Sequence, residues 1–178
     1  MPLEKTSASD RARTDGPRPE DSEKTASDEL RPDEFWMEEA LRCAQRALEV
    51  GEVPVGAVVV CGGEIVARGW NQNITGCDPT AHAEIIALRE AGAAVGNHRL
   101  KDCELFVTIE PCAMCAGAMV HARIQRLVYG ADDPKAGAVQ SAMQVLNHPQ
   151  LNHKVEVRRG VLAGRSAEVL RTFFRSRR

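Results

Sequence analysis

The sequence lacks any long apolar run, and this absence limits what the protein can be. No stretch of the 178 residues approaches the roughly 20 apolar residues that a membrane-spanning helix needs. The first residues hold no apolar core of a secretory signal, and their many acidic residues argue against a transit peptide. We therefore expect a cytoplasmic protein that has no contact with a membrane.

Apolar side chains are also scarce over the first 33 residues. These residues are mainly Ser, Thr, Asp, Glu, Arg and Pro, with nine acidic and six basic side chains. Such a segment cannot bury enough surface to offset the entropy that it would lose on ordering. The sequence therefore predicts a disordered extension over residues 1–33 and one folded domain over residues 34–178. Asp33 is the expected N-cap of the first helix.

Only one pair among the six cysteines has the spacing of a metal site, Cys112 and Cys115. Without an export signal, cysteines are expected as reduced thiols or metal ligands rather than as disulfides. The remaining four are therefore interpreted as buried or spare thiols: Cys43, Cys61, Cys77 and Cys103. A lone Cys-x-x-Cys pair also suits a redox centre or half of a structural zinc site, but a second such pair is missing.

A histidine and a glutamate earlier in the chain favour a catalytic zinc site. His82, Cys112 and Cys115 supply three ligands and leave the fourth tetrahedral position open for water. The sequence thus predicts one Zn²⁺ per chain. Glu84 is not a ligand in this interpretation, and we expect it to act as general base and then as general acid. The pattern H-x-E followed by P-C-x-x-C is typical of zinc-dependent deaminases of nucleobases.

Hydrophobic periodicity predicts helices and strands that alternate along the chain. Helices are expected over residues 34–50, 81–92, 112–121, 141–146 and 163–178. Strands are expected over residues 57–61, 64–70, 103–109, 126–129 and 154–157. Alternating strands and helices predict an α/β fold in which helices cover both faces of one sheet. Both parts of the zinc pattern then lie at the starts of helices, where partial positive charge favours thiolates.

Further segments resemble the bacterial tRNA-specific adenosine deaminase family. They are residues 53–57, 69–71, 78–85, 108–119, 135–138, 145–149 and 173–175. The zinc pattern alone is shared by cytosine, guanine and deoxycytidylate deaminases, so the later segments are the more discriminating ones. The resemblance covers about residues 35–178. It implies a cytidine-deaminase-like, three-layer α/β/α sandwich with a central mixed five-stranded sheet.

The resemblance also implies an activity and its partners. The family forms homodimers that convert adenosine to inosine at the wobble position, the first anticodon position, usually of an arginine tRNA. The anticodon loop would be the partner of this chain. By family pattern, the residues that bind the flipped base or the RNA would be Val55, Asn71, Ala83, Asp133, Lys135 and Phe174. The chain departs from the family at Asp132, where a basic residue is usual.

Basic residues concentrate at the C-terminal end of the chain. Residues 154–178 hold eight basic and two acidic residues, a net charge of +6 in a chain of net charge −2. This end either binds a polyanion or is a solvated helix face. A deaminase of a free base or nucleoside, of the cytosine or guanine type, would not need it. A zinc-stabilised binding subunit without catalysis is a further alternative, but such a subunit would typically lack Glu84.

Overall fold

A computed structural model describes residues 26–177 of the chain, with side chains from Asp33 onward. Most of the predicted disordered extension therefore lies outside the described residues, and its boundary stays a prediction. Within the described part, no helix is long and apolar enough to cross a membrane.

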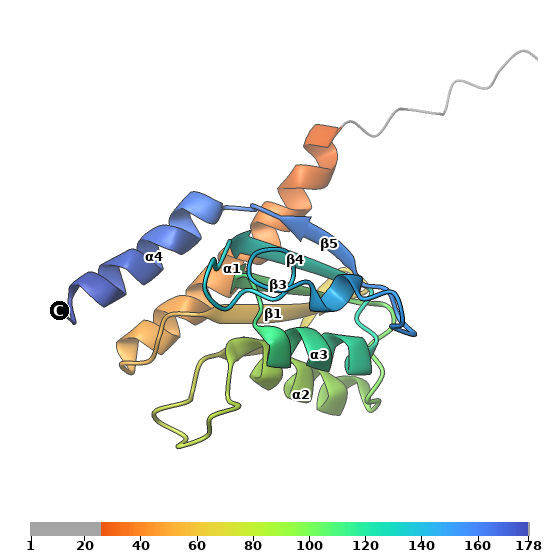
Figure 1. Ribbon diagram of the computed structural model, residues 1–178, viewed down its shortest axis with the longest axis horizontal. Helices are drawn as coiled ribbons and strands as arrows, with labels where there is room; N and C mark the ends of the chain where they lie inside the picture. Colours follow the sequence, from red (N-terminus) through yellow and green to blue (C-terminus); the bar gives the residue numbers. More distant parts are fainter. Residues whose placement is uncertain (1–25, 178) are drawn as a thin grey trace, which may run out of the picture.

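Five strands form one mixed sheet in the order β2-β1-β3-β4-β5 (Figure 1). Strand β1 (Gly56–Cys61) pairs antiparallel with β2 (Glu64–Trp70) and with β3 (Cys103–Ile109). Strand β4 (Arg126–Ala131) runs parallel to β3 and to β5 (Glu156–Arg159). The predicted mixed five-stranded sheet is confirmed.

Helices cover both faces of this sheet and make three layers (Figure 1). Helices α1 (Ala26–Glu49) and α4 (Ala163–Arg175) lie on one face. Helices α2 (Ala83–Val95) and α3 (Ala113–Ala122) lie on the other, where α3 contacts the short 3₁₀ helix η1 (Val145–Asn147). The three-layer α/β/α sandwich is confirmed.

The strands bury alternate side chains on the two faces, as the period of a strand requires. Val58 and Val60 lie in the cluster under α1, whereas Ala57 and Val59 lie in the larger cluster under α2 and α3. All four side chains are buried. A sheet covered on both faces therefore explains the continuous apolar run that this strand shows in the sequence.

Two glycines let the helices approach the sheet closely. A Cβ atom on Gly56 would lie 2.1 Å from the carbonyl oxygen of Ala40 in α1. A Cβ atom on Gly69 would lie 2.2 Å from the carbonyl oxygen of Ala83 in α2. Only glycine permits such contacts. The second contact fixes the start of α2 against the edge of the sheet, which matters for the site described below.

Several predicted helix and strand boundaries are wrong. The helix expected over residues 141–146 is replaced by the three-residue η1, and β5 begins two residues later than expected. Helices α2 and α3 begin at Ala83 and Ala113, so that His82 and Cys112 are N-cap residues rather than members of the first turn. The missing helix has a physical reason, because the N–H group of Val145 donates to the carbonyl oxygen of Ala138 at 2.9 Å and so cannot close a helical turn on Ser141.

The prediction that Asp33 is an N-cap is also wrong, since α1 begins at Ala26. The carboxylate of Asp33 is buried, and it accepts hydrogen bonds from Arg126 at 2.9 and 2.6 Å and from Arg158 at 2.6 Å. These partners lie on β4 and β5. Pairs so distant in sequence cannot be read from a local capping pattern.

The prediction of reduced thiols is wrong for one pair of cysteines. Cys61 and Cys103 form a disulfide, although we expected free thiols. The two residues are direct partners in the antiparallel register of β1 and β3, and their Cα atoms lie 4.3 Å apart. Their separation of 42 residues gave no hint of this contact. Cys43 and Cys77 are free, as expected.

Candidate active site

The candidate metal ligands come from the starts of two helices at one edge of the sheet. Both β2 and β3 run antiparallel to β1, so the helices that follow them begin at the same edge. His82 and Cys112 have extended backbones with φ of −72° and −73°, and their carbonyl oxygens accept the first helical hydrogen bonds from Ile86 and Ala116. Cys115 follows within the first turn of α3. Each side chain can then turn toward the other helix.

The three side chains fit a zinc ion. Nδ1 of His82 lies 3.6 Å from Sγ of Cys112 and 3.6 Å from Sγ of Cys115. Zinc bonds of about 2.3 Å to sulfur and about 2.0 Å to nitrogen, at tetrahedral angles, place such atoms about 3.6 Å apart. Among the described residues, these three form the one group of His, Cys, Asp or Glu with metal-site spacing.

The electrostatics of the two thiols suit a cation. Hydrogen bonds from Cys115 and His82 lower the pKa of Cys112 to about 3. The pKa of Cys115 is raised, chiefly because its hydrogen bond to Cys112 retains the proton. The hydrogen bond to Cys112 also raises the pKa of His82. Negative charge therefore gathers on the sulfur of Cys112, and Cys115 would release its proton on binding a divalent metal.

Glu84 lies beside this cluster in the first turn of α2. Its side chain is buried, and desolvation raises its pKa. A raised pKa means that the carboxyl group holds a proton more readily, so that it can both accept a proton and return it. Glu84 is therefore suited to proton transfer beside the metal group rather than to a structural ion pair.

One cavity of about 720 Å³ opens over this cluster. Its size is within the usual range for small-molecule sites. Most of the residues predicted for the site line it: Val55, Asn71, His82, Glu84, Cys112, Asp133, Lys135 and Phe174. Residues far apart in the sequence are thus brought together. Cys115 is buried beneath Cys112 and His82 as the third member of the cluster.

Asn71 and Ala83 contact each other. The backbone N–H of Ala83 donates to Oδ1 of Asn71 at 2.9 Å. Ala83 is buried and does not line the cavity in the described part of the chain, whereas Asn71 does. Because its oxygen is used, the side-chain amino group is what Asn71 can offer to a ligand. Any contribution of Ala83 would therefore act through the orientation of Asn71.

The C-terminal helix forms one wall of the cavity. Phe174 is 52% exposed and packs edge-on against the buried Phe173, with ring centroids 5.3 Å apart. Arg177 lies over the ring of Phe173 and donates to the carbonyl of Gly51 at 2.6 Å. This arrangement leaves one aromatic ring in the core and one at the cavity.

Sequence reasoning assigned no site role to six residues of the cavity wall: Val53, Asn73, Ile109, Glu110, Ala136 and Leu170. The wall also includes Asp132, noted above as a departure from the family, and Arg177 of the basic C-terminal end. Leu170 precedes Phe174 by one helical turn, so helical periodicity could have indicated it. Glu110 carried no local signal, because its partners lie more than 20 residues later in the chain.

Comparison with known proteins adds the family. The family model for MafB19-like deaminases matches residues 32–178. The tRNA-specific adenosine deaminase of Haemophilus influenzae is 50% identical over 147 residues, covering 82% of this chain and 85% of that protein. The chain belongs to the tRNA-specific adenosine deaminase family.

Solved structures agree with this membership. A structure from work on A-to-I editing by tRNA:A34 deaminases at the wobble position of transfer RNA matches this deaminase with a TM-score of 0.74. Its identity is 47%, over 76% of this chain and 99% of that chain. A guanine deaminase from Nitrosomonas europaea matches at 26% identity with a TM-score of 0.69, over 79% and 83% of the two chains. The first match combines high identity with full coverage of the solved chain.

Proposed function

We propose that this deaminase converts adenosine to inosine at the wobble position of a tRNA, with an arginine tRNA as substrate. The reaction consumes water and releases ammonia. The observation that carries the proposal is the buried Glu84 beside the His82–Cys112–Cys115 cluster, at a cavity of nucleoside size. The proposed tRNA substrate is supported by relatives named tRNA-specific adenosine deaminase and by the similar structure from work on tRNA:A34 deaminases.

One zinc ion per chain is part of this proposal. It would be held by Nδ1 of His82 and by the Sγ atoms of Cys112 and Cys115. When bound, zinc would supply the Lewis acidity that makes water a nucleophile near neutral pH.

Glu84 would move the protons of the reaction. Its carboxylate takes a proton from the attacking water and delivers it to the purine ring as the carbon bearing the amino group is attacked. The same carboxylate then takes the hydroxyl proton from the attacked carbon and passes it to the amino nitrogen, so that the C–N bond breaks, ammonia leaves and the carbonyl of inosine forms. Burial supports this role, because a carboxylate kept from bulk water holds its proton until the substrate receives it.

The cavity walls would bind the base and its neighbours. Asn71 would donate its side-chain amino group to the purine, and Val55 would contact the ring. On the opposite walls, the loop with Asp133 and Lys135 and the exposed ring of Phe174 would meet the RNA. Unpaired bases commonly stack on aromatic side chains of this kind.

We also propose a homodimer, a cytoplasmic location and a catalytic domain over residues 34–178, preceded by an extension. The homodimer and the domain rest on the family resemblance. The cytoplasmic location rests on the proposed tRNA substrate. Light scattering of the purified protein at several concentrations tests the dimer, which predicts twice the chain mass of 19.4 kDa.

Ammonia release from matched substrates tests the function. The zinc-loaded protein should release ammonia from an arginine tRNA transcript with adenosine at the wobble position, and not from the same transcript with guanosine there. Free guanine, cytosine and adenosine should give no comparable release. Release from free guanine alone would instead favour an activity like that of the Nitrosomonas europaea protein.

A further inference from the structure

Glu110 is a second buried glutamate of the cavity, and its surroundings differ from those of Glu84. It follows β3 directly and is only 2% exposed. Its Oε1 atom accepts backbone N–H groups of Val139, Gln140 and Ser141 at 3.1, 2.7 and 2.9 Å. Its Oε2 atom accepts the N–H of Asp133 at 3.1 Å and the hydroxyl of Ser141. All these donors belong to one loop, residues 132–141, which follows β4.

These five donors occupy the acceptor capacity of the carboxylate. A carboxylate offers about four lone-pair sites on two oxygens. Protonation of Glu110 would place an O–H donor against N–H groups that need an acceptor. This carboxylate is therefore unsuited to exchange protons with a substrate. Its contacts instead hold a loop that has little regular structure of its own.

The loop closes tightly over this carboxylate. A Cβ atom on Gly137 would lie 2.4 Å from both Cδ and Oε2 of Glu110. Next to it, the N–H of Ala138 donates to the carbonyl of Pro111 at 2.8 Å, and Gly137 forms an isolated antiparallel β-bridge with Cys112. The loop is thus anchored at the same turn that carries a candidate metal ligand.

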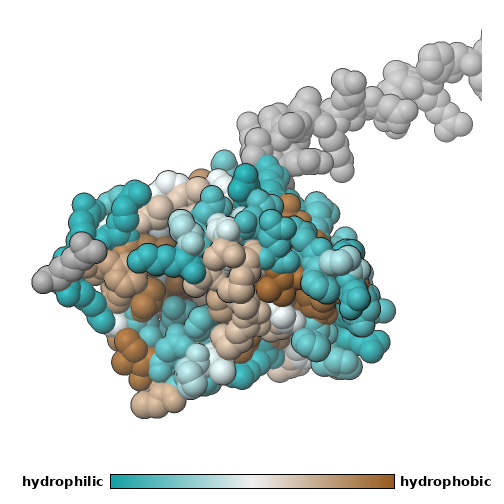
Figure 2. All heavy atoms as spheres, in the orientation of Figure 1, coloured by the Kyte–Doolittle hydropathy of each residue, from teal (hydrophilic) through white to brown (hydrophobic). Residues whose placement is uncertain are grey.

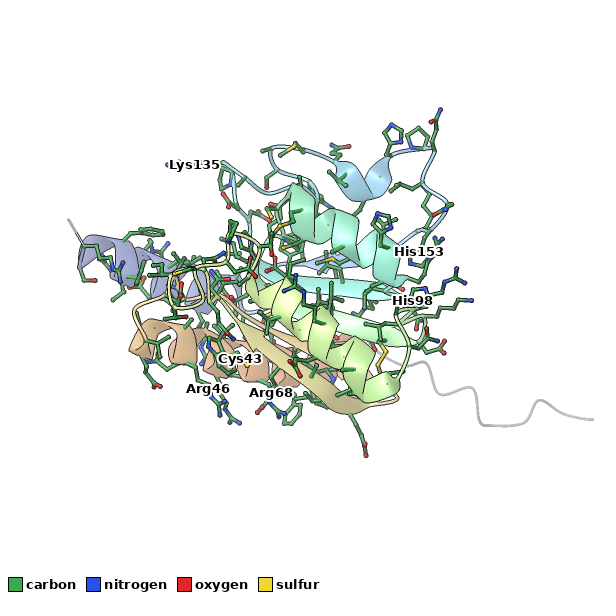
Figure 3. The ribbon with its side chains drawn as sticks, turned by 90° about the horizontal axis from the view of Figure 1, so that it is seen from below. Cys43, Arg46, Arg68, His98, Lys135 and His153 are labelled. Atoms are coloured by element: carbon green, nitrogen blue, oxygen red, sulfur yellow. A yellow bond between two sulfur atoms is a disulfide. The ribbon has the colours of Figure 1, made fainter. Side chains whose placement is uncertain are left out.

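The other end of the loop forms a wall of the cavity. Asp133, Lys135 and Ala136 line it. Oδ1 of Asp133 accepts the N–H groups of Lys135 and Ala136 at 2.9 and 3.2 Å. Figure 3 shows Lys135 extending outward from this loop. The hydrogen bond from Asp133 to Glu110 therefore connects the wall to the buried anchor.

We propose that Glu110 is a positioning residue that holds residues 132–141 as a wall of the substrate cavity and so determines affinity for the RNA. The proposal rests on the proposed function for its substrate. It assigns proton transfer to Glu84 alone.

The variant Glu110→Gln tests this role. A glutamine has one acceptor oxygen, so its amino group must face either the N–H groups of residues 139–141 or that of Asp133, none of which can accept. We expect trypsin to cleave after Lys135 about tenfold faster in native protein, because losing a hydrogen bond to a charged acceptor has an effect of this order. We expect KM for the tRNA transcript to rise about tenfold, with kcat within about twofold and zinc content unchanged.

Two controls separate loop position from general stability. Glu52→Gln alters another buried carboxylate, which accepts the N–H groups of Ile74 and Thr75 in a different loop. It should lower stability without speeding cleavage after Lys135. Gly137→Ala keeps Glu110 but displaces the loop, and it should reproduce both the faster cleavage and the higher KM. This second variant keeps the test decisive if Glu110→Gln does not fold.

Distinct results would overturn the two proposals. A wild-type protein inactive on tRNA but active on a free base would refute the proposed function, before any variant is compared. A fall in kcat at unchanged KM in the Glu110 variant would overturn the positioning role, and so would faster cleavage after Lys135 without any change in KM.

Discussion

Glu84 and Glu110 show at the scale of single residues how the fold gives one amino acid two roles. Both are buried and both line the cavity. Burial raises the pKa of Glu84. Burial alone would raise the pKa of Glu110 as well, but hydrogen bonds from Ser141 and from loop N–H groups lower it to about 2. The raised pKa lets the first group accept and return a proton more readily, whereas the second stays a carboxylate.

Replacing Glu84 by Gln should abolish turnover and leave the metal in place. General acid–base catalysis contributes about 10²–10⁴-fold, and one group here serves two transfers, so the loss should reach about 10⁴-fold or more. Inosine formation and zinc content are measured together. Glu90→Gln, an exposed position on the same helix, is the control and should keep full activity. Loss of zinc from Glu84→Gln would make Glu84 a ligand and contradict its role.

The site residues could be predicted from the sequence to different degrees. His82, Glu84, Cys112 and Cys115 follow from spacing, because their chemistry requires fixed residue types near helix starts. Glu110 could not be recognised in the same way. Its role depends on a loop more than 20 residues later in the chain. The local sequence Glu-Pro-Cys gives no indication of the five hydrogen-bond donors in that loop.

At the scale of elements, strands were easier to predict than helix ends. Alternating burial determines β1 and β3, since each strand buries opposite faces against different helices. The helix expected over residues 141–146 is absent because Val145 donates to Ala138 rather than to Ser141, and Asp33 is not an N-cap because its carboxylate binds Arg126 and Arg158. Local propensity indicates neither set of partners. The disulfide was missed for the same reason, as sheet register alone brings its cysteines together.

The disulfide predicts the number of reactive thiols. Oxidised protein, denatured in the presence of a chelator but without reductant, should show four thiols of the six cysteines. The reduced protein should show six, and it should be less stable by about 2–4 kcal/mol, the usual effect of closing a loop. Six reactive thiols in the unreduced protein would contradict the Cys61–Cys103 bond.

Asp33 should contribute strongly to stability through its arginines. Asp33→Asn removes the carboxylate that Arg126 and Arg158 share. Because Arg126 keeps Glu104 and Glu156, we expect a loss of about 1.5–3 kcal/mol, the usual effect of losing a hydrogen bond to a charged group. Urea unfolding measures the loss. Glu38→Gln is the control, because it breaks an exposed pair with Arg165 that is worth at most about 1 kcal/mol. Equal losses in both variants would show that the Asp33 cluster adds nothing beyond a surface pair.

At the scale of the whole molecule, the basic C-terminal end is less free than its composition suggests. Arg171 and Arg175 both pair with Glu168 on α4, and Arg165 pairs with Glu38 on α1. Polar side chains cover much of the surface around α4 in Figure 2. These arginines are exposed, and surface pairs are weak, so phosphates can replace the carboxylates. The chain's own acids therefore compete with RNA for this surface.

This competition predicts that removing one acidic side chain of α4 increases the affinity for tRNA. Glu168→Gln frees Arg171 and Arg175 from their shared partner and should tighten binding of the tRNA. The slope of log K against log salt should become steeper by about 0.7 for each additional phosphate contact. Glu90→Gln on α2 changes net charge equally and should leave the slope unchanged. Weaker binding after Glu168→Gln would mean that Glu168 orders α4 rather than competing with RNA.

The central claim is that this protein makes inosine at one position of a tRNA. Mass spectrometry of nuclease fragments of an arginine tRNA, after incubation with the zinc-loaded protein, locates any deaminated nucleoside directly. We predict inosine in the fragment containing the wobble position and unchanged adenosine in all others, with no product from the Glu84→Gln protein. Inosine spread over other positions, or none at the wobble position while free bases are deaminated, would contradict the account.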